Sequence, residues 1–177
     1  YGNGTNLRVG KSFGAWKSTL SFYASYNIFH GNELMNHVLE ENNGTSSLFK
    51  FQYSASPSMW LTVDFNAGLT SSSMSSDNWN YKRNKLSCDL NLSSPLTKNT
   101  ILGINNNFTR LMEDNSNFFV SDAYFRYTKG RWTFNFEINN IFNTTHYVDE
   151  IVTSTIMSRT SYNIRPREFL AGCSVQL

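Results

Sequence analysis

Charged residues, long apolar runs and cysteines are all scarce in this sequence of 177 residues. Only 16% of the residues are charged, well below the share of about a quarter that is usual in soluble domains. No run of about 18 apolar residues occurs, which excludes a transmembrane helix but not a membrane-spanning strand. The formal net charge of +2 is too small to predict a nucleic-acid partner. Because the N-terminal residues have no apolar signal segment, we expect either a signal already removed or a start within a longer protein.

The two cysteines, Cys88 and Cys173, are predicted to remain unpaired. The strand pattern described below places them about four strands apart, or roughly 19 Å at ~4.8 Å per strand. Because this separation exceeds the reach of a disulfide, we expect two small, buried, free thiols.

Aromatic residues, by contrast, make up 15% of the chain, and Asn, Ser and Thr carry most of its polarity. Segment 131–143 shows the arrangement most clearly, since Trp132, Phe134, Phe136 and Ile138 alternate with Thr133, Asn135, Glu137 and Asn139. This period of two predicts a strand with one apolar and one polar face. A soluble sandwich gives the two faces of such a strand the apolar and the aqueous surroundings they need, and so does a barrel with lipid outside and a water-filled lumen inside.

The same alternation recurs along the chain and predicts about nine antiparallel strands and no helix. Most are about ten residues long, which suits a tilted strand crossing a bilayer and exceeds the five or six residues usual in soluble sheets. Tight connections alternate with long polar ones; the tight ones are at Gly14, Pro57, Pro95 and Lys129-Gly130, and the long ones are at 30–46, 70–78, 112–117 and 144–163. Short turns on one side and long loops on the other favour an outer-membrane barrel over a sandwich.

Two of the long connections carry a more detailed expectation. Residues 30–46 form either a long loop or two strand extensions joined by a turn at Asn42-Asn43-Gly44. The serine-rich residues 70–78 are expected to form a flexible loop.

The strand count predicts that the chain is part of something larger. About nine strands cannot close into a barrel that has both ends on the periplasmic side. An open sheet in lipid would leave unpaired backbone groups along both edges. We therefore expect residues 1–177 to form the C-terminal portion of a larger transmembrane β-barrel.

Two motifs near the C-terminus point to a family. Asn139-Asn140-Ile141-Phe142-Asn143 resembles the Asn-[Leu/Ile]-Phe-Asn element of TonB-dependent outer-membrane transporters, and Arg165-Pro166-Arg167 resembles the opening of their last strand. The resemblance implies a barrel of about 22 strands and a plug domain that is not in this chain. The family usually ends in an aromatic residue, whereas this sequence ends in Leu177.

The resemblance also implies a function, namely uptake of an iron chelate, cobalamin or a glycan across the outer membrane of a Gram-negative bacterium. The implied partners are outer-membrane lipid, the missing N-terminal strands and plug, and an inner-membrane energy-coupling complex reached through that missing part. We expect no enzymatic activity, cofactor or nucleic-acid partner. Two alternatives stay open: a small stand-alone outer-membrane barrel serving as a pore, adhesin or structural protein, and a soluble carbohydrate-binding β-sandwich.

Aromatic residues at the two ends of the strands are the first candidate functional residues. Trp16, Trp60 and Trp132 lie beside tight turns, the level expected of an interfacial aromatic girdle. Trp79 and Tyr81 lie at the edge of a long outer loop, where they are candidates for ligand contact or further members of a girdle.

Charged residues supply the remaining candidates. Arg165 and Arg167 are expected at the outer interface, where they either contact anionic lipid headgroups or begin a solvated strand. Three acidic residues are predicted to face the lumen from separate strands, which argues against paired acid–base chemistry: Asp64, Asp89 and Glu137. Three histidines are predicted to lie in loops without metal-ligand spacing: His30, His37 and His146. The sequence therefore predicts no catalytic residue and no metal site.

Overall fold

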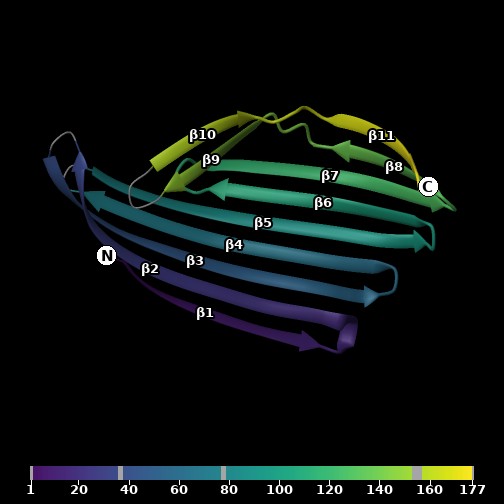
Figure 1. Ribbon diagram of the computed structural model, residues 1–177, viewed down its shortest axis with the longest axis horizontal. Coiled ribbons are helices and arrows are strands. Elements are labelled where there is room, and N and C mark those ends of the chain that lie inside the picture. Colours follow the sequence, from purple (N-terminus) through teal and green to yellow (C-terminus); the bar gives the residue numbers. More distant parts are fainter. Residues whose placement is uncertain (1, 36–37, 77–78, 153–156, 177) are drawn as a thin grey trace.

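The structure is a computed structural model that describes residues 2–35, 38–76, 79–152 and 157–176. Its elements are β1 Gly2–Phe13, η1 Ala15–Lys17 (a 3-10 turn), β2 Ser18–Met35, β3 Val38–Ser58, β4 Leu61–Ser76, β5 Trp79–Thr97, β6 Thr100–Leu111, β7 Ser116–Lys129, β8 Trp132–Asn139, β9 His146–Val152, β10 Met157–Asn163 and β11 Glu168–Val175. Nine strands form one antiparallel sheet in the order β1-β2-β3-β4-β5-β6-β7-β8-β11, and β9 and β10 form a separate hairpin (Figure 1). The prediction of an all-β, antiparallel fold is confirmed.

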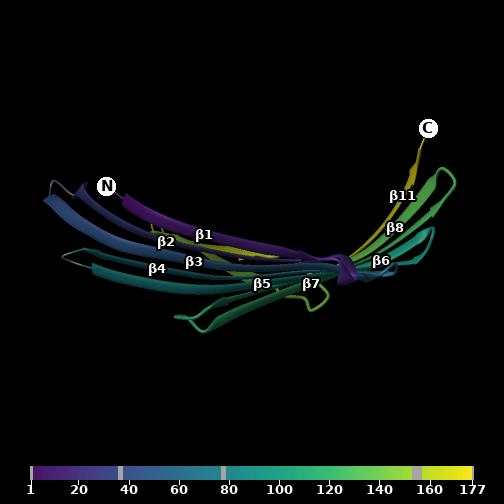
Figure 2. The same cartoon turned by 90° about the horizontal axis from the view of Figure 1, so that it is seen from below.

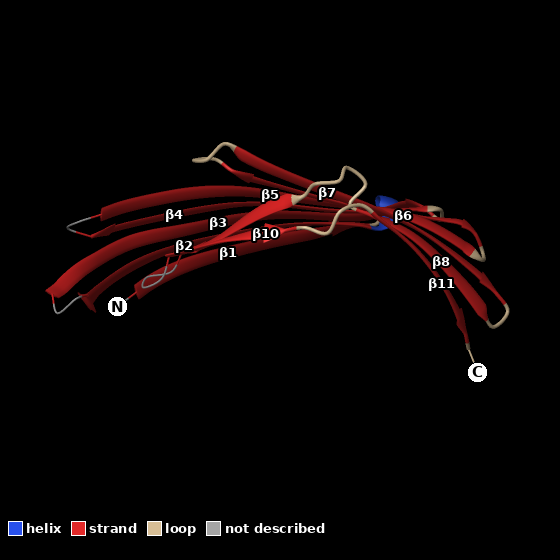
Figure 3. Cartoon of the chain, turned by 90° about the horizontal axis from the view of Figure 1, so that it is seen from above, coloured by secondary structure: helices blue, strands red, loops and turns tan. Residues whose placement is uncertain are grey.

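The main sheet is long, twisted and curved (Figures 2 and 3). Such coiling follows from the right-handed twist that accumulates across neighbouring strands. Among the described strands, β1 and β11 each pair on one side only, so this part of the chain forms an open sheet with two edges. Within the same residues, no helix is long and apolar enough to cross a membrane.

The hairpin connections lie at two opposite ends of the sheet, as the sequence predicts (Figure 1). At one end, which we call the tight-turn end, two- to four-residue connections join β1 to β2, β3 to β4, β5 to β6 and β7 to β8. Pro57 and Pro95 lie inside β3 and β5 instead of in the turns themselves. Both sit at a shift in strand register, where a residue without an N–H disturbs the ladder least.

At the opposite end, which we call the extended end, two of the predicted loops are strands. β2 to β5 contain 18, 21, 16 and 19 residues, about twice the expected length. The serine-rich segment 70–76 continues β4 and pairs with both β3 and β5. The prediction of a flexible loop there is wrong, because ladder hydrogen bonds on both sides outweigh the low strand preference of serine. The next connection, predicted as a longer loop over 112–117, is a shorter turn at 112–115.

Residues 30–46 take the second of the two predicted forms, strand extensions, but without the predicted turn. Asn42, Asn43 and Gly44 lie within β3 and pair with residues 31, 30 and 29 of β2. β2 ends at Met35 and β3 begins at Val38, and residues 36–37 between them lie outside the described residues. The last long connection, 144–163, contains the β9–β10 hairpin, so its prediction as a polar loop is also wrong.

The two faces of the main sheet differ in polarity, as the alternation predicts. On one face large apolar side chains stand uncovered, with Leu7 and Val9 each 56% exposed and Phe22 40% exposed. On the other, polar side chains bond across neighbouring strands, as Ser21 Oγ does to Gln52 Oε1 (3.2 Å) and Gln52 Nε2 to Asn66 Oδ1 (3.0 Å). We call these the apolar face and the polar face.

Except for Ala55 of β3, the buried apolar residues lie at the extended end, on the polar face or in the hairpin that packs on it. Leu111 is fully buried and contacts Phe118 of β7 and Val148 of β9. The β9–β10 hairpin therefore packs across the end of β6 and β7 (Figure 1). Met74 is also buried at this end, being 4% exposed, and it lies opposite Gly44 of β3.

The cysteines lie on β5 and β11, four strands apart in the sheet, and neither forms a disulfide. The prediction of free thiols is confirmed. The prediction that both are buried is wrong, because Cys88 is half-buried and Cys173 exposed on an apolar face that the described residues leave uncovered.

Candidate functional site

The three tryptophans predicted to form a girdle all lie at the tight-turn end. Trp16, Trp60 and Trp132 are 65%, 63% and 51% exposed. Trp132 stacks on Phe134 of the apolar face, with ring centroids 6.4 Å apart and planes inclined by 12°. On β1, at the other edge of the sheet, the Lys11 ammonium lies 5.3 Å from the centroid of the Phe13 ring. Amphipathic rings and a long cationic side chain at one level are what a membrane–water interface accommodates best.

The Asn139–Asn143 motif forms the corner between β8 and the β9–β10 hairpin. Asn140 has φ +53°, a left-handed conformation that Asn tolerates better than most residues. Its Nδ2 donates to the carbonyl oxygens of Thr144 (2.7 Å) and Arg165 (2.9 Å), and its Oδ1 accepts from the Thr144 N–H (2.8 Å). Since Asn140 is only 3% exposed, this side chain joins the chain leaving β8 to the chain entering β11.

Arg165 and Arg167 lie in the segment that enters β11. The Arg165 side chain is 86% exposed and its guanidinium lies 4.0 Å from the Glu168 carboxylate. The backbone N–H of Arg167 donates to Asn143 Oδ1 (3.0 Å). The backbone of this segment thus forms hydrogen bonds with the Asn139–Asn143 corner. The Arg165 guanidinium is exposed, as contact with lipid headgroups would require.

An ion network ties the extended end together. The Arg83 guanidinium on β5 lies 3.7 Å from Glu113 and 3.3 Å from Asp114, both in the β6–β7 turn. Asp114 also pairs with Arg159 of β10 at 3.1 Å. The Arg83 side chain is only 10% exposed, against 51% for Arg159. The nearly buried Arg83 therefore connects β5 to the β6–β7 turn, and Asp114 and Arg159 connect that turn to the β9–β10 hairpin.

Glu113 is held in its charged form. Partial burial opposes its ionisation, but the backbone N–H of Asn84 (2.9 Å), the Asn84 side chain (2.7 Å) and the Arg83 charge outweigh that effect. The pKa of Glu113 therefore lies below its ordinary value. A carboxylate that accepts several hydrogen bonds beside a cation is stabilised as the anion.

The two ligand-contact candidates of the extended end fall in different parts of the β4–β5 hairpin. Trp79 pairs with Ser76 at its tip. Tyr81 lies on the polar face, where its hydroxyl accepts from Arg83 Nε (2.9 Å) and its ring lies 5.6 Å from the same guanidinium. Tyr81 therefore supports the ion network.

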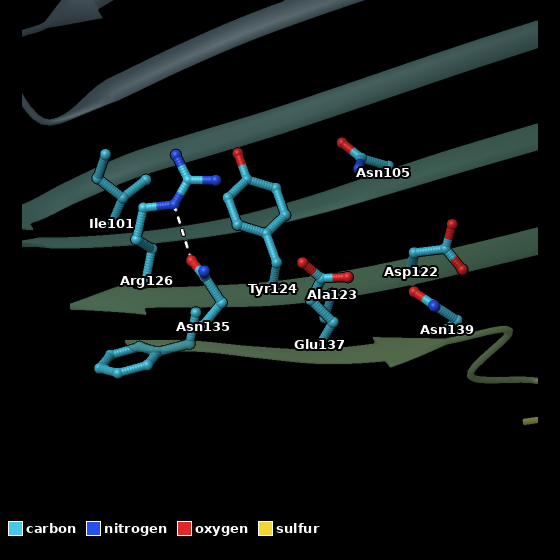
Figure 4. A pocket seen from close by; sticks show the side chains of 10 residues that line it. Ile101, Asn105, Asp122, Ala123, Tyr124, Arg126, Asn135, Glu137 and Asn139 are labelled. Carbon is cyan, nitrogen blue, oxygen red and sulfur yellow. Dashed lines mark hydrogen bonds between the residues drawn. The ribbon is translucent and has the colours of Figure 1, made fainter. Parts of the chain in front are cut away.

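A separate open cavity of about 290 Å³ lies on the polar face between β6, β7 and β8. Its polar lining comes from three neighbouring strands: Asn105, Asp122, Tyr124, Arg126, Asn135, Glu137 and Asn139 (Figure 4). Arg126 Nε donates to Asn135 Oδ1 (3.0 Å), and Asp122 Oδ1 accepts from the Asn140 N–H (2.7 Å). The strand alternation predicts the polar face, but the grouping of these side chains depends on the registers of β6, β7 and β8, which the sequence does not reveal.

The acidic and histidine predictions fare differently. Asp64, Asp89 and Glu137 lie on separate strands of the polar face. Asp64 accepts from the Ser54 hydroxyl and Asp89 from the Asn107 amide, so these two carboxylates belong to cross-strand polar pairs, whereas Glu137 borders the polar-face cavity.

His30 and His146 are strand residues, and the prediction of loops is wrong for both. His30 contacts Asn43 across β2 and β3, and His146 Nε2 lies 3.1 Å from Ser161 Oγ. His37 lies outside the described residues. In the described ranges, no three His, Cys, Asp or Glu side chains group together as a metal site.

No known protein family, curated protein or solved structure matches this chain.

Proposed function

We propose that this chain is the barrel portion of a TonB-dependent outer-membrane transporter, lying in the outer membrane of a Gram-negative bacterium. The observation that carries the proposal is the uncovered apolar face of a nine-stranded antiparallel sheet, combined with a polar opposite face. A soluble protein rarely exposes such a large contiguous apolar surface. Lipid on one side and a wet lumen on the other satisfy both faces at once.

The strand lengths also support the proposal. A tilted strand needs about ten residues to cross a bilayer, and β1, β6, β7 and β8 contain 12, 12, 14 and 8. The longer strands β2 to β5 extend past that span at the extended end. The proposal assigns this end to the outer side and the tight turns to the periplasm.

The two edges of the sheet argue for a larger barrel. β1 and β11 each have one described neighbour, and unpaired backbone groups at an edge each cost several kcal/mol in lipid. The proposed barrel therefore needs further strands that pair with both. Its partners would be the remaining strands, a plug domain, outer-membrane lipid and the inner-membrane energy-coupling complex.

The first experiment measures the depth of tryptophan in the bilayer. Single-tryptophan variants that keep Trp16, Trp60 or Trp132 are placed, in the full protein, in vesicles whose lipids carry bromine at different depths. We expect each to be quenched most strongly by bromine near the headgroups. The variant that keeps Trp79, at the tip of the β4–β5 hairpin, is the matched control and should be quenched weakly at every depth.

Equal, weak quenching of all four tryptophans would overturn the membrane proposal and favour the soluble sandwich. Transport is tested separately. Uptake through the full protein should stop when the proton gradient across the inner membrane is dissipated. Uptake that continues without the gradient would favour a passive stand-alone pore.

A further inference from the structure

The polar-face cavity contains an aromatic ring set flat against the sheet. Tyr124 of β7 lies opposite Gly103 of β6. A Cβ added to Gly103 would lie 2.2 Å from Tyr124 Cζ and 2.4 Å from both Cε1 and Oη. The ring therefore occupies the space above the Gly103 backbone, and Figure 4 shows it broadside across β6. Glycine at this position permits the close approach.

The outer face of the ring borders the cavity, and unused polar groups surround it. Asn105 lies beyond one side of the ring and Arg126 beyond the other, while Glu137 reaches in from β8 (Figure 4). In the described part of the chain, the Tyr124 hydroxyl and the side chains of Asn105, Glu137 and Asn139 form no hydrogen bond or ion pair with one another or with other residues. Their donors and acceptors are free for a ligand.

A flat apolar surface bordered by amides, carboxylates and a guanidinium fits one ligand chemistry well. A pyranose ring has a face of C–H bonds that packs on an aromatic ring and a rim of hydroxyls that both donate and accept hydrogen bonds. Two carboxylates against one guanidinium disfavour an anionic ligand. We propose that this cavity is a binding subsite for one sugar unit of a neutral oligosaccharide, with Tyr124 as its stacking platform.

The inference deepens the proposed transport function and rests on it for the identification of the sugar as cargo. A cavity of about 290 Å³ is at the small end of ligand pockets, which start near ~300 Å³. It therefore suits a single unit, and its open side lets the oligosaccharide continue along the polar face.

Saturation-transfer NMR on the full protein in deuterated detergent tests the subsite, with maltohexaose and cellohexaose as probes. We expect saturation of the ring C–H protons of at least one probe. Tyr124→Ala should weaken its binding about tenfold, the loss expected for one aromatic contact. Tyr23→Ala, which removes an aromatic residue from the polar face of β2, is the matched control and should leave binding unchanged.

A second variant keeps the ring but moves it. Gly103→Ala forces the Tyr124 ring off the sheet and into the cavity, so it should reduce binding to the same degree while the protein still unfolds at a similar denaturant concentration. Absence of saturation transfer from both probes would overturn the subsite. So would equal binding by wild type and Tyr124→Ala.

Salt dependence separates the sugar from a charged occupant. Binding of a neutral sugar should change little when ionic strength rises, whereas a cationic peptide segment would bind less tightly; a strong salt effect overturns the inference. The tryptophan-depth measurement reports separately on the membrane. Sugar binding that depends on Tyr124 in a protein whose tryptophans avoid lipid would leave the subsite standing and reject the transporter.

Discussion

Asn140→Ala is the variant whose effect can be worked out most fully from the structure. The wild-type amide makes three hydrogen bonds, to the carbonyl oxygens of Thr144 and Arg165 and from the Thr144 N–H. Each is worth about 1 kcal/mol net. Alanine would also have to keep φ +53°, which we take to add about 1 kcal/mol. We expect the free energy of unfolding to fall by about 4 kcal/mol.

Two matched variants separate these contributions. Asn140→Gly loses the same three hydrogen bonds but adopts positive φ freely, so it should be destabilised by about 3 kcal/mol. Asn143→Ala changes the other left-handed residue of the motif, which has φ +56°. Its side chain accepts one hydrogen bond, from the Arg167 N–H to Oδ1. Because Asn143 is exposed, its loss should reduce stability by no more than about 2 kcal/mol.

The assay is urea unfolding of the full protein in lipid vesicles, followed by tryptophan fluorescence. A loss in the free energy of unfolding below about 1 kcal/mol for Asn140→Ala would be close to that of an ordinary surface substitution. It would refute the role of the Asn140 side chain in holding the corner together. So would a glycine variant less stable than the alanine variant. If the motif instead contacted a ligand, Asn140→Ala would reduce binding and leave the unfolding midpoint in place.

Three further predictions concern the extended end. Leu111→Ala should destabilise the packing of β9 by about 2–5 kcal/mol, because the side chain is fully buried; hydrogen exchange at Val148 should rise, and unchanged exchange would contradict the contact. Arg83→Gln should lower the free energy of unfolding by about 2–3 kcal/mol and Arg159→Gln by less than about 1 kcal/mol, because their side chains are 10% and 51% exposed. Equal losses for the two variants would exclude burial as the cause of the difference. The pKa of Glu113 lies below its ordinary value of 4.5. Its contribution to the stability of the extended end is therefore complete above that pH and is lost as pH falls through the lowered pKa. Exchange in β10 should therefore stay low above that pH and rise only as pH falls below it, and Glu113→Gln should abolish the rise.

The parts of the fold that follow from the sequence are those that need only local information. Alternation along 132–139 predicts both the strand and its two faces, because side chains on a strand point to opposite sides in turn. Gly130 adopts φ +60° in its tight turn, a conformation that glycine permits, and Gly14 lies in the turn between β1 and β2. The alternation of turn types then places both turns at one end of the sheet, as the structure has it.

The parts that the sequence does not predict depend on partners distant along the chain. Residues 70–76 alternate weakly, yet β5 pairs with all of them and β3 pairs with 70–75. Tyr147 contacts the ring of Phe118, with centroids 5.1 Å apart, so the β9–β10 hairpin has an apolar contact that no local pattern reveals. The same holds for the cavity, since Tyr124 and Gly103 meet only through the register of β6 and β7.

One physical cause connects these unpredicted features. The alternation predicts a polar face that is solvated along its whole length. At the extended end, however, this face carries buried apolar groups. Phe29, Gly44, Met74 and Tyr81 are consecutive cross-strand neighbours on β2 to β5, and Leu111 and Phe118 continue the apolar surface under the hairpin. Burial of apolar side chains at this end stabilises the longer strands. The polar face is therefore packed at the extended end and open nearer the tight turns, where the Tyr124 cavity remains accessible.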